Sequence, residues 1–536
     1  MEFGALSLMP ALAAVALCLW TQRVLFSLAL SVWLAGMLLV SADHALWEVP
    51  LLGLGRTVAT VGGESSLIQV ALVDAFKVKI VLFTVFVALM VGVMSASGAT
   101  RAMVQILERR ARSRQGGMVV TWLAGLLVFF DDYANCLVVG NAMRPLGDRL
   151  GISREKLAYI VDSTAAPIAS LALISTWIGY EVGLFSDALN GVATEYVALG
   201  LTPPDTNAYL FFAEGIGYRF YSLFTIVFVG AIAITGRDFG PMRRAEQRAI
   251  LRHADKKEEA AESLPASLAG GAILPIVLLL GLTGWFLWTE GKAGLPQGAA
   301  LIEILGSENL DPADVMFRAS LWALGASLLL ALAFGRSGLK PLAQAMLQTL
   351  RQLSKALVVL CLAWTLAHAI QELSAAAFMK DLLGNTLPVS LLPAAVFLVA
   401  SLTSFATGSS FTTMGVLTPM AVPLAFQMTI GLEPAFAATI QFATAGAVLT
   451  GACWGDHCSP ISDTTVLSSI GCDCDHVQHV RTQLPYALIC GSLSLLLGSL
   501  AVGLGVSVWI CLGAGALASI LTVRVLGRLP HEDQAA

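Results

Sequence analysis

Charged side chains are scarce in this chain. Asp, Glu, Lys and Arg together make up 12% of its 536 residues, whereas hydrophobic residues make up 57%. A soluble domain has about twice that charged fraction. Together with a mean hydropathy of +0.78, this composition excludes an ordinary soluble enzyme or binding module. It predicts an all-α polytopic membrane protein.

Several other features are missing. No concentrated basic arm accompanies the net charge of −5, so nothing supports nucleic-acid binding. No phosphate-cradling glycine loop is present, so ATP-driven transport has no support, and we expect no cofactor. The nine cysteines are scattered, which argues against a disulfide framework. The N-terminus has Glu2 in place of a basic region, and we expect its first span to be retained.

Long uncharged windows are abundant. Each is close to the roughly 20 residues that a helix needs to cross the bilayer core. Counting them and the less uniform apolar segments, we predict about eleven complete spans and two further hairpins. The clearest windows are Ala5 to Trp20, Val24 to Ala42, Ile80 to Ala99, Tyr221 to Gly236, Leu264 to Thr289 and Ala487 to Ile510.

Loop charge predicts the orientation, because short loops rich in Lys and Arg stay in the cytoplasm. Stretches that are acidic or mixed in charge fall outside. This places the N-terminus outside and the C-terminus in the cytoplasm. The basic loops are Arg101 to Arg114, Arg144 to Lys156, Arg237 to Lys257 and Arg336 to Lys355; the outer stretches are Asp43 to Glu64, Glu181 to Glu214 and Glu290 to Asp314.

Two segments fit re-entrant hairpins, which enter the membrane and return to the same side. The first, residues 118–143, is long enough to span, yet both of its flanks are basic. It would carry FFDDYANC (Phe129 to Cys136) at its tip. The second, residues 388–428, is too long for one span and contains the polar run TSFATGSSFTT (Thr403 to Thr413). It would enter from outside.

Each hairpin precedes an interrupted apolar helix, expected over residues 156–183 and 435–470. The stretches DSTAAPI (Asp162 to Ile168) and GDHCSPI (Gly455 to Ile461) place a carboxylate, small polar residues and a proline inside these helices. Breaks at Pro167 and Pro460 are tolerated in a membrane where the exposed backbone lines a cavity enclosed by protein. The two halves run in opposite directions, so we predict two inverted-topology repeats that share a binding site.

The repeats suggest a division of the chain. Residues 1–236 would form the first inverted repeat and residues 263–505 the second. Between them, residues 237–262 are dense in charge and are expected to form a solvated cytoplasmic linker. Residues 506–536 would add one more span and a tail.

Five acidic residues lie within apolar segments: Asp131, Asp132, Asp162, Asp456 and Asp463. Each costs about 2.5 to 3.5 kcal/mol to insert into a bilayer, so we expect a compensating role. Carboxylate, carbonyl and hydroxyl oxygens suit Na⁺, and a carboxylate that binds either Na⁺ or H⁺ exchanges the two by competition. The pattern predicts an antiporter that holds no metal besides the transported Na⁺.

Neutral oxygens would complete such a site, and the half-helix ends would direct backbone groups to the same place. His457 is a candidate proton relay, or a buried neutral imidazole satisfied by a carbonyl. The candidate oxygen donors are Asn135, Ser163, Thr164, Ser409, Ser410, Ser459 and Thr464.

Structural roles compete with several of these assignments. Asp131 or Asp132 could pair with Arg144, and which of the two would bind the ion stays open. Asp162 could cap the half-helix that begins at the break, and Asp463 could cap the outgoing one.

Two other kinds of site are disfavoured. An intramembrane hydrolase would use Asp456, His457 and Ser459, but residues so close in sequence make an awkward triad. A zinc site is disfavoured because structural sites more often use wider Cys spacing; its ligands would be Cys472, Cys474, His476 and His479.

Three runs resemble the NhaC-type sodium/proton antiporters of bacterial inner membranes. They lie at Phe129 to Ile168, Trp454 to Ser469 and His479 to Ala487, and the last reads HVRTQLPYA. The resemblance covers about Val85 to Ile178 and Leu357 to Ala487. That family is placed in the ion-transporter superfamily, whose members have two inverted repeats, each with a re-entrant hairpin and a broken helix.

The resemblance implies that both hairpin tips and both breaks form the ion site, which adds Thr407 and Thr412. It also implies a scaffold through which a homodimer can form, and a transport part that moves against it. The partners would be Na⁺, H⁺ and the lipid of the inner membrane. Similar carriers exchange organic acids, so an antiporter for malate-like or lactate-like acids or for amino acids is the alternative. Arg144 would then be the nearest donor for a carboxylate.

Overall fold

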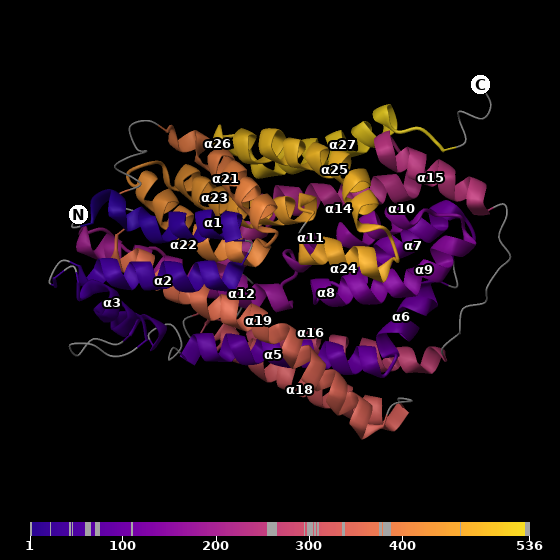
Figure 1. Cartoon of the computed structure of the whole chain (residues 1–536), viewed down its shortest axis with the longest axis horizontal. Coiled ribbons are helices and arrows are strands. Elements are labelled where there is room, and N and C mark those ends of the chain that lie inside the picture. The colour runs from indigo at the N-terminus through magenta and orange to yellow at the C-terminus, as the bar shows by residue number, and fades with distance from the viewer. Residues whose placement is uncertain are drawn as a thin grey trace.

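The structure is a computed structural model of the whole chain, and helices make up nearly all of its regular elements (Figure 1). Within the described residues, the β-structure is limited to one isolated bridge between Asp238 and Arg528. The all-α class is thus confirmed. The described residues are 3–21, 23–41, 44–45, 47–58, 66–69, 75–108, 111–253, 265–293, 295–296, 304, 307, 310–334, 338–374, 378, 387–460 and 462–530.

The helices of the first half are α1 (Met9–Thr21), α2 (Val24–Val40), α3 (Val49–Val58), α5 (Ala75–Ala96), α6 (Ala99–Glu108), α7 (Arg114–Leu127), α8 (Asp132–Ala134), α9 (Gly140–Arg149), α10 (Arg154–Asp162), α11 (Ala166–Ala169), α12 (Thr176–Ala198), α13 (Ala208–Gly215), α14 (Phe220–Thr235) and α15 (Gly240–His253). Those of the second half are α16 (Gly270–Gly291), α18 (Pro312–Phe334), α19 (Leu339–Glu372), α21 (Leu392–Thr407), α22 (Ser410–Met428), α23 (Pro434–Cys458), α24 (Asp463–Gly471), α25 (His476–Leu493), α26 (Ala501–Gly503) and α27 (Val508–Leu526).

In the described part of the chain, eight helices are long and apolar enough to cross a membrane, and a bent pair would make nine. This pair, Ala208–Tyr218 and Phe220–Thr235, meets at 49°. The bend lies at Arg219, a buried side chain that pairs with Glu181 at 2.9 Å and donates to the carbonyl of Ser170. Shorter apolar helices also occur, and the count of about eleven spans stays a prediction.

The first hairpin consists of α7, a short turn, α8, a π-helical segment (Asn135–Val139) and α9. At its tip the carbonyls of Gly125 and Val128 lie where α7 ends, so they lack partners within the helix. Asn135 supplies a donor to these two carbonyls: its Nδ2 lies 2.8 Å from the oxygen of Gly125 and 3.2 Å from that of Val128. The amide therefore holds the tip in its turned conformation.

The first interrupted helix begins at α10, which Ser153 caps and which ends at Asp162. A turn of three residues separates it from α11, and Pro167 lies in the first turn of α11, where its missing N–H does no harm. The capping role considered for Asp162 is wrong, because α11 follows Ala165 and has no side-chain cap. Asp162 instead ends the preceding helix.

The second hairpin consists of α21 and α22, joined at Gly408, whose φ of +64° favours glycine. Each arm is itself long and apolar enough to cross a membrane, so its re-entrant course stays a prediction. Ser409 caps α22. In the following interrupted helix, residues 459–462 separate α23 from α24. The cap of α24 is Ser462, whose Oγ accepts from the backbone of Thr465. The capping role considered for Asp463 is therefore wrong.

The two hairpins occupy opposite halves of the molecule (Figure 1). α7, α9 and α10 lie toward the end that carries the C-terminus, whereas α21, α22 and α23 lie toward the end that carries the N-terminus. The short helices α8, α11 and α24 lie between these groups. Each hairpin is thus followed by a broken helix, and the interruptions lie in the interior; the inverted topology of the two halves stays a prediction.

The linker was expected to be solvated, and most of its described residues are exposed or half-buried, but two of its acidic side chains are buried. Asp238 is fully buried, pairs with Lys156 of α10 and accepts a hydrogen bond from the hydroxyl of Tyr486 at 2.6 Å. Glu246 of α15 is also buried and pairs with Arg114 at the start of α7. Residues 237–253 are thus packed onto the hairpin and the broken helix. Residues 254–262 of the linker lie outside the described residues.

Replacing Lys156 tests this anchorage. Lys156→Met leaves the carboxylate of Asp238 buried without its cation, so we expect the free energy of unfolding to fall by about 3 to 5 kcal/mol. Thermal and denaturant unfolding of the purified protein in detergent measures the loss.

Arg248→Met is the matched control. Arg248 also joins α15 to α10, through Glu155 at 3.2 Å, but it is 53% exposed. Its removal should cost at most about 1 kcal/mol. Equal losses for the two variants would contradict a buried ionic anchor.

Candidate functional site

Asp162 is the centre of the buried polar cluster and is 1% exposed. Its Oδ2 accepts hydrogen bonds from Gln483 Nε2 at 2.7 Å, Thr465 Oγ1 at 3.1 Å and His479 Nε2 at 3.3 Å. Its Oδ1 accepts from Ser468 Oγ at 3.3 Å. All four donors belong to α24 and α25, so the carboxylate joins the broken helix of the first half to the second half.

The position of Asp162 explains why so many donors gather there. It is the last residue of α10, where the helix dipole is negative and disfavours a carboxylate. A buried carboxylate is tolerated when its lone pairs are occupied, and it has about four acceptor sites. Three of the four donors bond to Oδ2 and one to Oδ1, so Oδ1 keeps an acceptor site. A cation can approach the carboxylate through Oδ1, which accepts only from Ser468.

His457 lies beside Asp162, with Nε2 3.9 Å from Oδ2. Its ring bonds to two hydroxyls, Ser163 Oγ at 3.1 Å and Tyr221 OH at 2.5 Å. The alternative in which a carbonyl satisfies the imidazole is therefore wrong. The hydrolase triad is not formed either, because neither ring nitrogen contacts Ser459.

Asp456 reaches the same region from the second half. It is 2% exposed, and its Oδ2 accepts from Thr464 Oγ1 at 3.1 Å. The next residue, Thr465, donates to Asp162. Adjacent threonines at the start of α24 thus bond to one carboxylate from each half. The two broken helices meet at this point.

The first hairpin contacts the cluster through the residues after its tip. Asn135 Nδ2 donates to the carbonyl of Thr164 at 2.7 Å, in the first break. Cys136 Sγ accepts from Ser468 Oγ at 3.1 Å. Asp132 is 3% exposed, and Asp131 is half-buried. The hydroxyl of Thr164 donates to carbonyls of its own helix.

Hydroxyls of the second hairpin lie farther along α23. Ser410 donates to the carbonyl of Ala452, one turn before Asp456, at 3.2 Å. Ser409 caps α22 and accepts from Thr412 Oγ1 at 3.1 Å, and Thr407 donates within α21 at 3.4 Å. These side chains bond within the hairpin or to α23. The structure does not join them to the donors around Asp162.

The remaining candidates lie at the second break. Ser459 is buried and follows the end of α23, and the carbonyl of Pro460 accepts from His476 Nε2 at 2.7 Å. The side chain of Asp463 lies outside the described residues. His476 and His479, weighed together as metal ligands, have different partners, because His479 bonds to Asp162.

Sequence reasoning missed His479, Gln483, Thr465 and Ser468 as site residues. His479 and Gln483 are four residues apart, so they lie on one face of α25. Both belong to the run HVRTQLPYA. A polar pair at that spacing in an apolar helix was the available signal.

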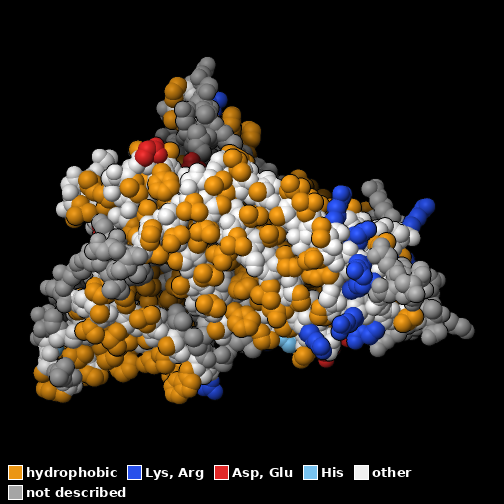
Figure 2. All heavy atoms as spheres, turned by 90° about the horizontal axis from the view of Figure 1, so that it is seen from above, with side chains coloured by type: hydrophobic (Ala, Val, Ile, Leu, Met, Phe, Trp, Pro, Cys, Tyr) orange, Lys and Arg blue, Asp and Glu red, His pale blue; other side chains and the backbone are white. Residues whose placement is uncertain are grey.

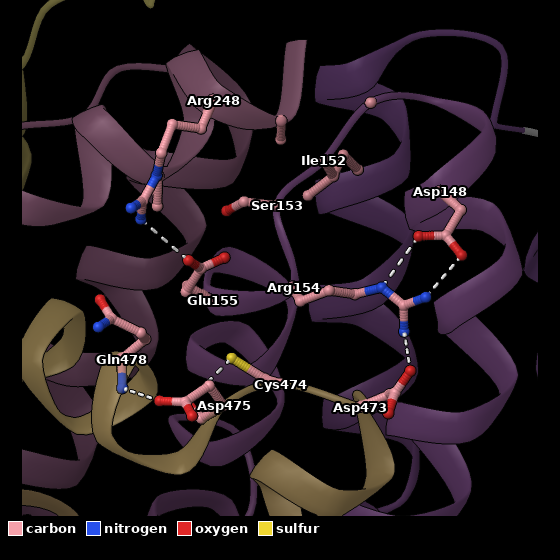
Figure 3. Close-up of a pocket in the computed structure, with 13 residues that line it drawn as sticks. Asp148, Ile152, Ser153, Arg154, Glu155, Arg248, Asp473, Cys474, Asp475 and Gln478 are labelled. Atoms are coloured by element: carbon pink, nitrogen blue, oxygen red, sulfur yellow. Dashed lines mark hydrogen bonds and ion pairs between the residues drawn. The ribbon is translucent and has the colours of Figure 1, made fainter. Parts of the chain in front are cut away.

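A pocket of about 450 Å³ opens where α9, α10, α15 and α25 meet (Figure 3). Arg154 makes two hydrogen bonds to Asp148, at 2.7 and 2.9 Å, and Arg248 pairs with Glu155. Asp473 lies beside Arg154. The pocket lies at the N-terminal ends of α10 and α25, the helices that carry Asp162 and Gln483.

The structure has two hairpins that approach from opposite ends and a buried carboxylate cluster where two helices are interrupted. These features define a membrane transporter. The particular group follows from comparison with known proteins. The chain belongs to the Na⁺/H⁺ antiporter family, whose sequence profile matches residues 168–504.

The chain is also similar to individual proteins. The chain is 30% identical over 483 residues to an uncharacterized protein of Haemophilus influenzae, covering 90% of this chain and 88% of that protein. Shorter matches include the Na⁺/H⁺ antiporter NhaC of Alkalihalophilus pseudofirmus, 38% identical over 105 residues, which are 19% of this chain and 21% of that protein. The arginine/ornithine antiporter ArcD of Halobacterium salinarum is 40% identical over 111 residues, 20% of this chain and 21% of that protein.

A solved structure supports the fold. The crystal structure of the YdaH transporter of Alcanivorax borkumensis aligns with a TM-score of 0.56 at 18% sequence identity, covering 92% of this chain and 99% of that chain.

Asn135 provides a test of the hairpin tip. Asn135→Leu keeps the approximate size of the side chain but removes the donor to three buried carbonyls. An unsatisfied buried group costs about 1 to 3 kcal/mol, so we expect a loss of several kcal/mol. Thermal unfolding in detergent measures it.

Asn141→Leu, on the returning arm of the same hairpin, is the control. Its Nδ2 donates to a single carbonyl, that of Leu137, from an exposed position. We expect a change within about 0.5 kcal/mol. A similar, small effect at Asn135 would show that the tip does not depend on this amide.

Proposed function

We propose that this chain exchanges Na⁺ or Li⁺ for H⁺ across the inner membrane of a bacterium. The main observation is that adjacent threonines of α24 donate hydrogen bonds to Asp456 and to Asp162, which brings the two carboxylates into one cluster. Two carboxylates from opposite repeats, surrounded by hydroxyls, suit a small hard cation. Membership of the Na⁺/H⁺ antiporter family supports the same cargo.

Competition for Asp162 would couple the two ions. Na⁺ would approach the carboxylate through Oδ1, which has one donor, and a proton bound in the cluster cancels the charge that attracts Na⁺. The imidazoles of His457 and His479 lie within reach of that carboxylate and can carry the proton. Na⁺ and H⁺ would then occupy the cluster in alternation, as exchange requires.

The distribution of charge favours an outside N-terminus and a cytoplasmic C-terminus. Hydrophobic side chains cover the middle of the face in Figure 2, and Lys and Arg side chains gather at one end. In Figure 1 that is the end with the C-terminus, and the N-terminus lies at the other. Short basic segments stay in the cytoplasm. The pocket beside α10 and α25 would then face the cytoplasm.

An amino-acid or organic-acid antiporter is the second candidate, favoured by the match to the arginine/ornithine antiporter. A carboxylate substrate would need a cationic partner in the site. Arg144 does not supply it, because this side chain is 41% exposed and faces Asp473 at 3.7 Å. The charge of buried Arg219 is matched by Glu181. These contacts favour a cation as the cargo.

Everted membrane vesicles test the exchange. We expect an imposed pH gradient to collapse when Na⁺ or Li⁺ is added to vesicles that contain this protein. Asp162→Asn and Asp456→Asn should each abolish the response, because neither amide can exchange a cation for a proton. Folded protein is measured in parallel by size-exclusion chromatography in detergent.

Asp205→Asn, in the loop before α13, is the control and should respond like the wild type. Full activity of the Asp162 or Asp456 variant would remove that residue from the mechanism. A gradient that collapses with arginine or a carboxylate, and not with Na⁺ or Li⁺, would establish the second candidate instead.

A further inference from the structure

Gln483 of α25 joins the two broken helices through a single amide group. Its Nε2 donates to Asp162 Oδ2 at 2.7 Å and to the carbonyl of His457 at 2.5 Å. Asp162 ends α10, and His457 lies in the last turn of α23. Both hydrogens of the amide are therefore used, one on each half of the transporter.

These bonds fix the direction of the amide. Both atoms that face Nε2 are oxygens, so exchanging the nitrogen and oxygen of Gln483 would bring three oxygens together without a hydrogen. Oε1 must therefore point away from the two acceptors. The side chain is 1% exposed, which leaves little freedom for another rotamer.

Oε1 of Gln483 is buried and has no hydrogen-bond partner among the residues that the structure describes. A buried acceptor without a donor is rare, because it loses its bonds to water and gains nothing in return. Asn135 of the first hairpin shows the same pattern: its Nδ2 is used by carbonyls, and its Oδ1 is buried without a partner in the described part of the chain.

The surroundings of Gln483 attract positive charge. The negative ends of α10 and α23 both reach its amide, and the carboxylate of Asp162 adds a full charge. One carboxylate does not complete the coordination of a cation, so an ion bound in this cluster also needs neutral oxygens. An amide oxygen is a neutral, hard ligand suited to Na⁺ or Li⁺.

We propose that Gln483 is a ligand of the transported alkali cation through Oε1, and that its Nε2, bonded to both half-helix ends, fixes the direction in which Oε1 faces that ion. The inference rests on the proposed exchange of Na⁺ or Li⁺. It assigns to α25 a direct part in binding, beyond the hairpins and breaks predicted from the sequence. The cation would lie between the two halves.

Cation-dependent stability tests this role without a transport assay. Purified protein in detergent is unfolded thermally over a NaCl or LiCl series, with choline chloride keeping the ionic strength constant. A bound cation stabilises the folded state, so the midpoint of the wild type should rise with Na⁺ concentration. Gln483→Met preserves length but removes both polar atoms. It should raise the half-effective Na⁺ concentration by about tenfold to a hundredfold.

Gln483→Glu separates the two functions of the amide. It keeps an oxygen where Oε1 lies and replaces the donor with a second oxygen, which can face Asp162 only if the two carboxyl groups share a proton. Over a pH series it should therefore keep, at the pH where that proton is retained, a Na⁺-dependent shift that the Met variant lacks. Gln478→Met on the same helix is the control and should behave like the wild type. If the Met variant does not fold, Gln483→Asn withdraws the oxygen by one methylene and should also weaken the Na⁺ response.

The possible results separate a failure of this assignment from a failure of the proposed exchange. An unchanged Na⁺ response in the Met variant, or in the Asn variant where Met does not fold, overturns the assignment. Equal loss of the response in the Glu and Met variants at every pH of the series also overturns it, because an oxygen at this position would then make no difference. A wild type that neither responds to Na⁺ or Li⁺ nor exchanges them in vesicles refutes the proposed function itself. A wild type that exchanges normally while Gln483→Met keeps its Na⁺ response refutes only this inference.

Discussion

The structure depends on keeping one carboxylate buried between two halves of a membrane protein. Asp162 ends a short helix, where the backbone itself disfavours negative charge. Its stability comes from Gln483, Thr465, His479 and Ser468, all of which lie in the second half of the chain. Neither half can therefore form its polar interior alone. The hydrogen bonds that join the two halves are therefore the same ones that surround the site carboxylate.

A second set of buried contacts links the cluster around Asp162 to the start of the linker, near the end of the molecule that carries the C-terminus. α10 carries Asp162 at one end, and near its other end Lys156 pairs with the buried Asp238. Tyr486 of α25 donates to that carboxylate as well. The two helices that meet at Asp162 are thus also joined by the start of the linker. A movement of one against the other would change the contacts at both ends.

The sequence predicted the parts of the site that have a local signature. A carboxylate followed by a proline in an apolar run marked both breaks, and an apolar segment with basic flanks on both sides marked the first hairpin. The sequence indicated three ionisable residues, because such side chains are rare and costly in a membrane: Asp162, Asp456 and His457. The structure places them in one cluster. His479 and Gln483 carried no comparable mark, because a neutral polar residue in a helix is inexpensive and common. The linker was misjudged because its charges were counted without their partners.

The sequence by itself determined the all-helical class, the two hairpins and the two interruptions, because hydropathy, loop charge and helix-breaking residues act over a few neighbouring positions. The tertiary structure decided which side chains share hydrogen bonds. Thr465 and Gln483 lie about three hundred residues from Asp162 in the chain. Such contacts follow from how helices pack and which faces they turn to each other, and no local pattern encodes that.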